Sequence, residues 1–438
     1  MEIFAREYLG KLSLSLELAK LGNEVFIGNT HTIKSLAEGA KEDSVYFEIK
    51  GQSGIASSHI AKLKKNKILI VGQDEEAGIS FLNFEDFAKF RPELSGLENF
   101  DSFFSWGEVD LNFLASKETT VTLEKTGSPR TAFWGSHGEA FYRKEAEELM
   151  ATHGEYILLV TNLAWINSLK SSRQENKLFK ESNYGPEFRN AFLKRTKWEA
   201  LAHKKTLEIV KKILIETEYK IILRPHPSEN IDLWRREIPN EPRIMVSKKG
   251  PVTPLILGAC HILHSGSTVG IESMLLEKST ITYQDLLGFE DFPMTANRYS
   301  QSAQSLDTFV EMLVKGFTHS PREGFSDFIK KRMSFCSTNE PAKIQARIIS
   351  NLRPPMTIKE EYMELNFKPN KIRRASRIKS RILYGKNQQE SLNTHKRPEI
   401  TLDTVLNDVK ALSTIFEIEN QFDIKRIAES TFKIAQQK

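Results

Sequence analysis

The chain contains very little cysteine. Cys260 and Cys336 are the two cysteines among 438 residues. Two thiols are too few for a disulfide framework or for a zinc site built on cysteine, so the sequence argues against both classes. We therefore expect a protein of a reducing compartment, and we place it in the cytoplasm.

Long apolar runs are also missing. No stretch approaches the roughly 18 consecutive apolar residues that a membrane-spanning helix needs. The first residues, Met1 to Glu7, do not combine a basic region with an apolar core, so we expect no secretory signal peptide. A length of 438 residues is sufficient for two or three domains with substantial cores.

The sequence has no large excess of charge. It carries 62 Lys and Arg against 57 Asp and Glu, which indicates no particular partner for the molecule as a whole. Residues 368–386 differ, with eight Lys or Arg and no acid. We interpret this run as a solvated linker; the alternative is peripheral contact with an anionic membrane face, at roughly 1 kcal/mol per basic residue. We expect no nucleic-acid partner, because no recognition motif accompanies the charge.

Helical and extended patterns alternate over residues 1–135. The extended patterns lie at 24–27, 45–47, 67–72, 103–105 and 120–123, and the helical ones at 7–21, 31–38, 54–63 and 107–115. Such alternation is typical of an α/β domain with a doubly wound parallel sheet. We therefore predict a first Rossmann-like domain over 1–135.

A second alternating block follows a helical pattern at 139–152. Its extended patterns lie at 156–160, 220–223, 243–246, 260–263 and 280–283, separated by helical ones, while 170–195 is polar and irregular. We predict a second Rossmann-like domain over 136–352, facing the first across a cleft. Residues 353–438 are predicted to form a basic linker and a helical tail, with amphipathic helices at 401–417 and 422–435.

Polar residues follow two strands of the second block. One strand ends at Arg224-Pro-His-Pro227 and another at His264-Ser-Gly-Ser-Thr268. Carboxyl ends of parallel strands share one edge of a sheet, where loop amides and helix N-termini bind phosphate. We predict a phosphate site there, with Arg224 and His226 as donors. The alternative is a pair of ordinary strand ends with a Ser/Thr helix cap.

Two further residue types in this block have alternative roles. Glu272 lies one turn into the following helix, where it either accepts ribose hydroxyls or merely favours the helix N-terminus. Of His261 and His264, we expect at least one to be structural. The sequence has no Asp-x-Asp pattern, so we expect no metal ion and no other cofactor.

A carboxylate cluster follows a strand of the first block. Asp74, Glu75 and Glu76 come directly after the apolar run that ends at Gly72. A carboxylate at a strand end is suited to take a proton from a hydroxyl as a general base. A solvated acidic turn without chemistry is the alternative interpretation.

Five motifs together carry a resemblance to a known family. They are Arg6-Glu7 before a Leu-rich helix, Asp74-Glu75-Glu76, Gly127-Ser-Pro-Arg130, Arg224-Pro-His-Pro227 and His264-Ser-Gly-Ser-Thr-Val-Gly-Ile-Glu272. Over residues 1–350 the chain resembles the bacterial surface carbohydrate biosynthesis proteins, which are GT-B-like glycosyltransferases. It is more distantly similar to capsule polysaccharide synthases, polysialyltransferases and CDP-glycerol glycerophosphotransferases.

The resemblance implies roles for individual residues. By similarity, His226-Pro227 and Ser267-Thr268 would bind a CMP moiety, and Glu75-Glu76 would supply the general base. Arg6, Glu7, Arg130 and Asn162 are further candidates in the cleft. The chain departs from the family pattern at Ala77, where glycine is expected and Gly78 follows one residue later, and at Ser128 and Ala132, where Asn and Asp are frequent.

The function implied is a cytoplasmic glycosyltransferase of bacterial surface polysaccharide or lipopolysaccharide biosynthesis, including capsule. Its partners would be a nucleotide sugar, of which a CMP-linked acidic sugar is one option, and a glycan or lipid-linked glycan acceptor. Two alternatives remain open at this point. One is an enzyme similar to UDP-N-acetylglucosamine 2-epimerase, and the other is a catalytically inactive GT-B-like scaffold.

Overall fold

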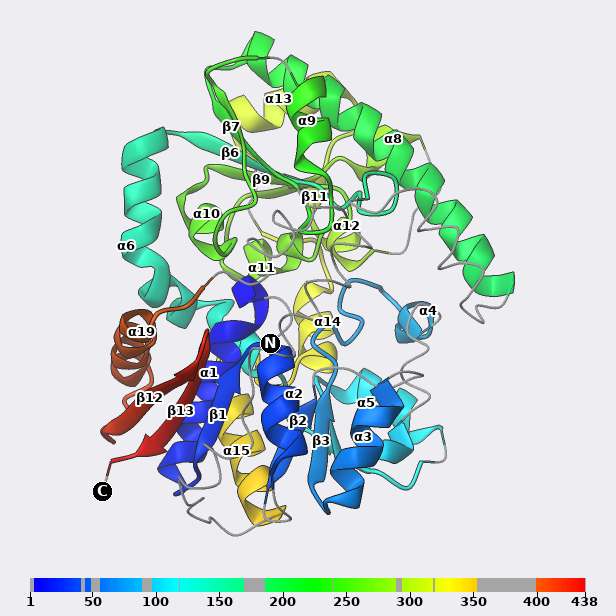
Figure 1. Cartoon of the computed structure of the whole chain (residues 1–438). Helices are drawn as coiled ribbons and strands as arrows, with labels where there is room; N and C mark the ends of the chain where they lie inside the picture. Colours follow the sequence, from blue (N-terminus) through cyan, green and yellow to red (C-terminus); the bar gives the residue numbers. More distant parts are fainter. Residues whose placement is uncertain are drawn as a thin grey trace. The chain divides into compact units, whose positions relative to one another are not determined.

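The computed structural model describes residues 4–40, 44–48, 56–88, 97–117, 119–168, 186–238, 240–288, 294–317, 320–352 and 399–437. The chain forms two compact units (Figure 1). The first unit contains Met1–Ala77, Arg91–Phe141 and Asp327–Lys438, and the second contains Gly78–Phe90 and Tyr142–Ser326. In the described residues, no helix is long and apolar enough to cross a lipid bilayer.

The second unit is built on a six-stranded parallel sheet with the order β11-β10-β9-β6-β7-β8. Every neighbouring pair in it is parallel. The strands are β6 (Tyr156–Val160), β7 (Lys220–Arg224), β8 (Ile244–Val246), β9 (His261–His264), β10 (Thr280–Thr282) and β11 (Gln301–Ser302). A parallel order of this kind requires a crossover connection between successive strands.

Helices cover both faces of this sheet (Figure 1). They are α8 (Pro186–Glu216), α9 (Ile231–Glu237), α10 (Thr253–Gly258), α11 (Val269–Leu275), α12 (Thr295–Tyr299) and α13 (Leu306–Lys315), with a 3-10 turn η3 (Gln284–Leu287). The short α4 (Phe84–Ala88) also belongs to this unit. Alternate residues of β6 enter different cores. Ile157 packs with Trp198 of α8, whereas Leu158 packs with Ile256 of α10. Burial on both faces explains the uninterrupted apolar strands.

The first unit contains a four-stranded parallel sheet with the order β2-β3-β4-β5. The strands are β2 (Val45–Glu48), β3 (Leu69–Gln73), β4 (Ser102–Ser105) and β5 (Thr122–Lys125), and the helices are α1 (Phe4–Lys20), α2 (Thr30–Glu38), α3 (Ala56–Lys65), α5 (Glu108–Ala115) and α15 (Glu340–Leu352). Ile70 of β3 packs towards α3 and α5, while the neighbouring Val71 packs towards α1 and α15. The predicted α/β class with two parallel-sheet units is confirmed.

The C-terminal tail was predicted to be helical, and half of this prediction is wrong. The helix α19 (Leu402–Ile415) is present, but 422–435 forms the strands β12 (Phe422–Ala428) and β13 (Thr431–Gln436). β13 pairs antiparallel with both β12 and β1 (Val25–Gly28). Apolar residues alternate within each half, at Phe422 and Ile424 and at Phe432 and Ile434. An alternation with a period of two favours strands, and β1 provides the edge with which β13 pairs.

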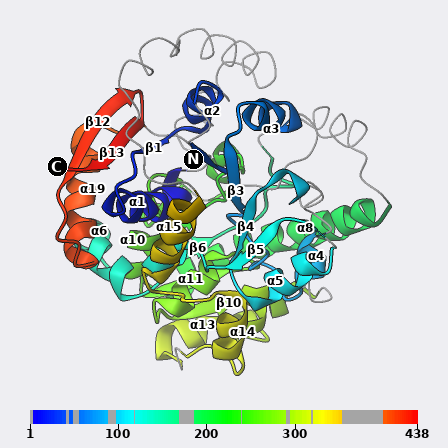
Figure 2. The ribbon, with the colours of Figure 1, turned by 90° about the horizontal axis from the view of Figure 1, so that it is seen from below.

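The units also correct the predicted domain ranges of 1–135, 136–352 and 353–438. Residues 327–352 and the described part of the tail belong to the first unit, and 78–90 belongs to the second. The physical reason is that α15 packs along α1 and β13 pairs with β1 (Figure 2). The helix α6 (Ser136–His153) and the helix α14 (Phe325–Arg332) each contain residues of both units.

Two other predictions fall partly or wholly outside the described residues. The basic run 368–386 lies outside them. The segment 170–195 was predicted to be irregular, but its described part, from residue 186 onward, is the start of α8. The helical pattern at 198–217, one of those that separate the extended patterns of the second block, lies almost entirely in α8, which begins earlier.

Candidate functional site

The acidic cluster in the first unit begins where β3 ends. Gln73 is the last residue of β3, and Asp74 follows it. The Asp74 Oδ1 atom accepts hydrogen bonds from the amides of Glu76, at 2.7 Å, and Ala77, at 3.0 Å. These bonds form a turn at the strand end, as short acidic side chains commonly do. Asp74 therefore shapes the turn that presents Glu75 and Glu76.

The turn needs left-handed backbone at two residues. Ala77 has a φ of 38° and Gly78 a φ of 67°. A left-handed conformation costs a residue with a Cβ roughly 1–2 kcal/mol relative to glycine. This cost makes glycine the more favourable residue at position 77. Here Ala77 adopts the same region, and its side chain is buried.

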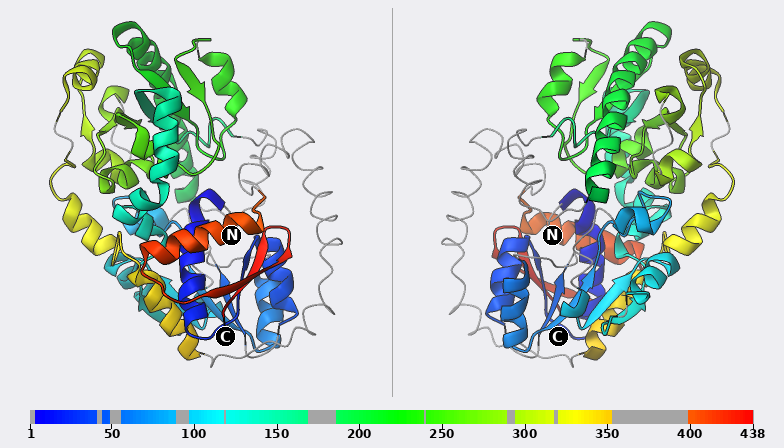
Figure 3. Two further views of the ribbon diagram at one scale, coloured as in Figure 1. Left: turned by 90° about the vertical axis from the view of Figure 1, so that its left-hand side faces the viewer. Right: turned by 90° about the vertical axis from the view of Figure 1, so that its right-hand side faces the viewer.

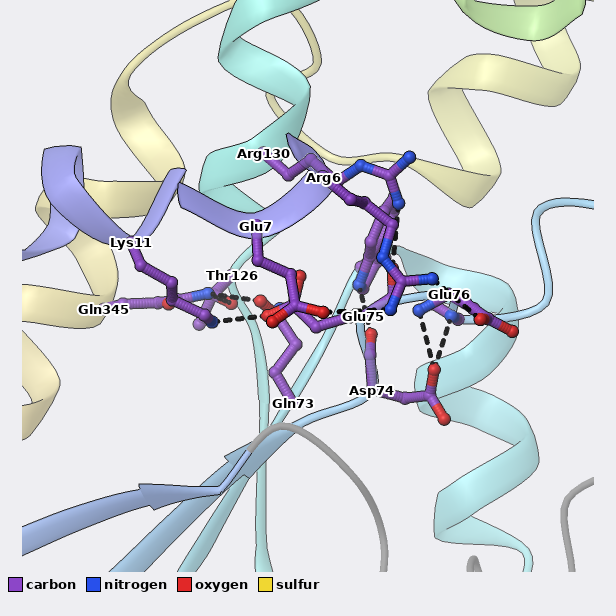
Figure 4. A network of polar contacts seen from close by, with 12 residues as sticks. Arg6, Glu7, Lys11, Gln73, Asp74, Glu75, Glu76, Thr126, Arg130 and Gln345 are labelled. Atoms are coloured by element: carbon purple, nitrogen blue, oxygen red, sulfur yellow. Dashed lines mark hydrogen bonds and ion pairs between the residues drawn. The ribbon is translucent and has the colours of Figure 1, made fainter. Parts of the chain in front are cut away.

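The first turns of α1 supply cations to this cluster (Figure 4). Arg6 donates to Glu76 Oε1 at 2.8 Å and to Glu7 Oε1 at 3.0 Å. Lys11 Nζ lies 2.5 Å from Glu75 Oε1. Our sequence reasoning missed Lys11. Its spacing of four residues from Glu7 places both on one face of a helix, and that signal was available in the sequence.

Arg130 approaches from the 3-10 turn η2 (Pro129–Phe133). Its Nη1 donates to the Glu75 carbonyl at 3.1 Å, and its guanidinium lies 5.0 Å from the Trp134 ring centre. A Cβ atom on Gly10 would lie 2.7 Å from the Arg130 amide nitrogen, so α1 approaches η2 closely only because residue 10 is glycine. The structure therefore brings the predicted residues Arg6, Glu7 and Arg130 together with Glu75.

The side chains of Glu75 and Glu76 differ in their exposure to solvent. The Glu75 side chain is 4% exposed and the Glu76 side chain 45% exposed. Burial by itself would lower the pKa of Arg6, but the nearby carboxylates of Glu76 and Glu7 outweigh it and raise that pKa. Arg6 thus stays charged and holds Glu76 in place. Of the two, Glu76 is the carboxylate that a substrate can reach.

The predicted phosphate loop of the second unit follows β9. Gly266 has a φ of 68°, its amide donates to Asn297 Oδ1 at 2.7 Å, and its carbonyl accepts from Asn162 Nδ2 at 2.8 Å. Within the described part of the chain, the amides of Ser267 and Thr268 have no hydrogen-bond acceptor. Two neighbouring amides without an acceptor are suited to an anion.

A buried network of hydrogen bonds supports the loop after β9 from the interior of the second unit. Gln284 Oε1 accepts from Trp198 Nε1 at 2.6 Å, from Asn297 Nδ2 at 3.1 Å and from Ser265 Oγ at 3.4 Å. Thr282 also donates to Asn297 Oδ1, at 2.9 Å. Our sequence reasoning missed Gln284 and Asn297. No motif marks them, because they come from η3 and α12 and meet the loop only in the folded unit.

Arg224 and Glu272, both predicted to contact the nucleotide, are bound to other parts of the protein. Arg224 donates to the carbonyls of Lys249 at 2.6 Å and Gly250 at 2.5 Å. Burial lowers its pKa to about 10, against the opposing effect of Glu272 and Glu145. Glu272 accepts from Thr253 Oγ1 at 2.6 Å. Both residues therefore support the segment between β8 and α10.

His226 lies in the loop after β7. Its Nδ1 accepts from the Ser228 amide at 3.2 Å, so the neutral ring carries its proton on Nε2. The loop itself is held by Glu229, a buried residue that we did not single out. Its carboxylate accepts from the His226 amide, from Thr161 Oγ1 at 2.8 Å and from Trp234 Nε1 at 2.7 Å.

Both histidines of β9 are structural. His264 is fully buried, with Nε2 2.8 Å from Ser300 Oγ, and burial lowers its pKa to about 3. It therefore stays neutral and packs under α11, where a Cβ atom on Gly270 would touch it. His261 contacts Ser279 Oγ and the Leu313 carbonyl. The predicted contact between His264 and a donor phosphate is thus corrected: the side chain lies in the interior.

The low pKa of His264 predicts a loss of stability in acid. An unfolded histidine takes up a proton below about pH 6.5, whereas folded His264 does not, so stability falls as pH decreases through this range. Between pH 7.5 and 5.0 the parent should lose about 2 kcal/mol more unfolding free energy than His264→Asn. Chemical denaturation at both pH values measures this difference. Equal losses in parent and variant would contradict the prediction.

Proteins similar to this chain are found among solved structures. No family model matches the chain, and no curated protein matches it either. Similar solved structures include the wall teichoic acid polymerase TagF, with 10% identity over 73% of this chain and 92% of that one, at a TM-score of 0.40. Another is UDP-GlcNAc 2-epimerase from Methanocaldococcus jannaschii, with 14% identity over 79% and 82%, at a TM-score of 0.43.

Proposed function

We propose that the chain is a GT-B-like glycosyltransferase that moves a sugar from a nucleotide-activated donor to a hydroxyl of a glycan or lipid-linked glycan, in the biosynthesis of bacterial surface polysaccharide or lipopolysaccharide. One observation is the main support for this proposal. The Ser265–Thr268 loop is held on both sides by asparagine side chains while its Ser267 and Thr268 amides keep no acceptor in the described residues. A preformed amide pair of this kind suits a donor phosphate.

The donor side would stabilise the leaving phosphate. The amides and hydroxyls of Ser267 and Thr268 would provide donors, and the His226 imidazole, after the end of β7, would add a further one. Fixed donors in a rigid loop need no reorganisation as charge develops on the leaving group. The donor base is open, and a CMP-linked acidic sugar is one candidate. No step of this scheme uses a metal ion.

The acceptor side would use the carboxylate of Glu76. It takes the proton from an acceptor hydroxyl, the hydroxyl oxygen bonds to the anomeric carbon, and the bond from that carbon to the phosphate oxygen breaks. The leaving nucleotide phosphate keeps the electron pair. Arg6, paired with Glu76 at 2.8 Å, would hold the carboxylate in one orientation.

Transfer with and without acceptor tests the function. Thermal shift with CMP, CDP, UDP and GDP first identifies the base, since a ligand specific to the folded state raises the melting temperature. The matching nucleotide sugars are then incubated with the protein. A transferase releases free nucleotide only when an acceptor is present. Conversion of the sugar without released nucleotide would indicate an epimerase, and no binding would indicate an inactive scaffold.

The role of His226 gives a prediction about affinity. His226→Ala should weaken binding of the nucleotide found by thermal shift by about tenfold, the scale of one lost hydrogen bond to a charged group. The matched control is His59→Ala, since His59 pairs with Glu38 at 2.9 Å within the first unit. Calorimetry should show parent-like affinity for this control. Unchanged affinity in His226→Ala would remove this histidine from the site.

A further inference from the structure

The C-terminal segment 399–437, here called the C-terminal clamp, packs against α1, the helix that contains Arg6 and Lys11. Nearly every residue of α1 from Glu7 to Ala19 is buried. The parallel sheet and α15 cover the side with Leu14 and Leu18, and η2 covers Gly10. A helix buried on all sides needs cover from a further element. β13 and α19 supply it (Figure 3).

The clamp is joined to the N-terminal part by several kinds of contact. β13 pairs with β1 over four residues, and Lys433 Nζ forms an ion pair with Glu24 at 2.7 Å. A Cβ atom on Gly28 would lie 2.4 Å from Thr431 Oγ1, so the two strands meet without space for a side chain. Phe416, after α19, packs edge-on against Phe133 of η2.

One contact reaches the functional end of α1. The Tyr8 hydroxyl donates to Asp408 Oδ2 of α19 at 2.9 Å. Tyr8 is buried, and it follows Arg6 and Glu7 directly. A bond at this point holds the first turns of the helix, which otherwise tend to fray.

We propose that the C-terminal clamp positions the acidic cluster for catalysis, with Asp408 acting through Tyr8 as a positioning residue. This inference rests on the proposed function. Loss of the bond frees the first turn of α1, and Arg6 then no longer fixes Glu76. A small misplacement of a catalytic group costs turnover by one to two orders of magnitude. Donor binding is unaffected, because the donor loop belongs to the second unit.

Two substitutions that remove the hydrogen bond between Tyr8 and Asp408, and one that preserves it, test this role. Asp408→Ala and Tyr8→Phe should each lower kcat by roughly 10 to 100 fold while KM for the donor stays within about twofold. The double variant should be no worse than either single one, because both remove the same bond. Asp408→Asn keeps an oxygen that accepts from the Tyr8 hydroxyl and should restore most of the activity. Asn407→Ala, at an exposed neighbouring residue, is the control.

A second measurement does not need activity. Amide hydrogen exchange in residues 6–12 should be about tenfold faster in Asp408→Ala than in the parent, and unchanged in Asn407→Ala. Parent-like exchange in Asp408→Ala would overturn the inference. A parent protein without any transfer activity would instead defeat the proposed function, and the exchange result would still stand by itself. Loss of kcat without rescue by Asp408→Asn would also overturn the positioning role.

The same contacts make a C-terminally truncated chain unsuitable for testing membrane contact. Deletion of 368–438 would remove the basic run together with β13 and α19. The truncated protein would expose one side of α1 and lose the bond to Tyr8. Membrane contact through 368–386 is therefore better tested by replacing basic residues within that run in the full chain.

Discussion

Glu76→Gln is expected to reduce transfer by about 10² to 10⁴ fold, the usual cost of losing a positioned general base. Donor affinity should stay within about twofold, because the base acts chiefly in the transition state. Glutamine keeps the size of the side chain and an oxygen that accepts from Arg6, so the fold should survive. Turnover is measured with a matched acceptor, and donor affinity is measured separately by calorimetry.

Glu75→Gln is the matched comparison, and its effect should differ in kind. Glu75 is buried against Lys11 at 2.5 Å. Removing one partner of a buried ion pair leaves the other charge uncompensated and costs roughly 3–5 kcal/mol of stability. Glu75→Gln should therefore melt earlier, whereas Glu76→Gln should melt like the parent. If Glu76→Gln turns over like the parent, the base is a different group.

The second large effect is expected at Gly266. A Cβ atom there would lie 3.0 Å from both Met294 Cγ and Trp198 Cη2, and the residue has a φ of 68°. Gly266→Ala should therefore displace the loop from Asn162 and Asn297 and turn the Ser267 and Thr268 amides away from the donor. We expect nucleotide affinity to fall by about a hundredfold, the sum of lost charge-assisted bonds on the usual scale.

Gly288 provides a control that separates backbone strain from packing. It has a φ of 59°, and a Cβ atom there would meet nothing within 4 Å. Gly288→Ala should cost roughly 1–2 kcal/mol of stability, the price of a left-handed alanine, and leave nucleotide affinity unchanged. Calorimetry on both variants makes the comparison. Equal affinities in Gly266→Ala and the parent would contradict the role of the loop.

Several elements could be predicted because short-range patterns specify them. The strand at 156–160 and the core 221–223 of the next one are apolar and buried on both faces, as is typical of a parallel sheet covered by helices. The turn after β3 could be placed because polar residues follow an apolar run directly. Lys11 was within reach of the same reasoning, through its spacing from Glu7.

Other assignments failed where a local pattern fits two structures. Residues 422–435 are amphipathic with either a helical or an extended period, and the free edge of β1 selects the strand. Arg224 and His264 looked like donors for a phosphate because both end a strand. Their direction depends on neighbours far along the chain: Arg224 meets the carbonyls of Lys249 and Gly250, and His264 meets Ser300.

The sequence by itself determined the α/β class, most strands and helices, and the two polar strand ends from which a site was inferred. These depend on hydrophobic period and turn chemistry, which act over a few residues. Only the tertiary structure decided which polar side chains are exposed. The sequence places Glu75 and Glu76 side by side, and packing buries Glu75 against Lys11 while Glu76 reaches solvent. Burial and partner choice are properties of the packed chain, since they depend on residues brought together from distant positions.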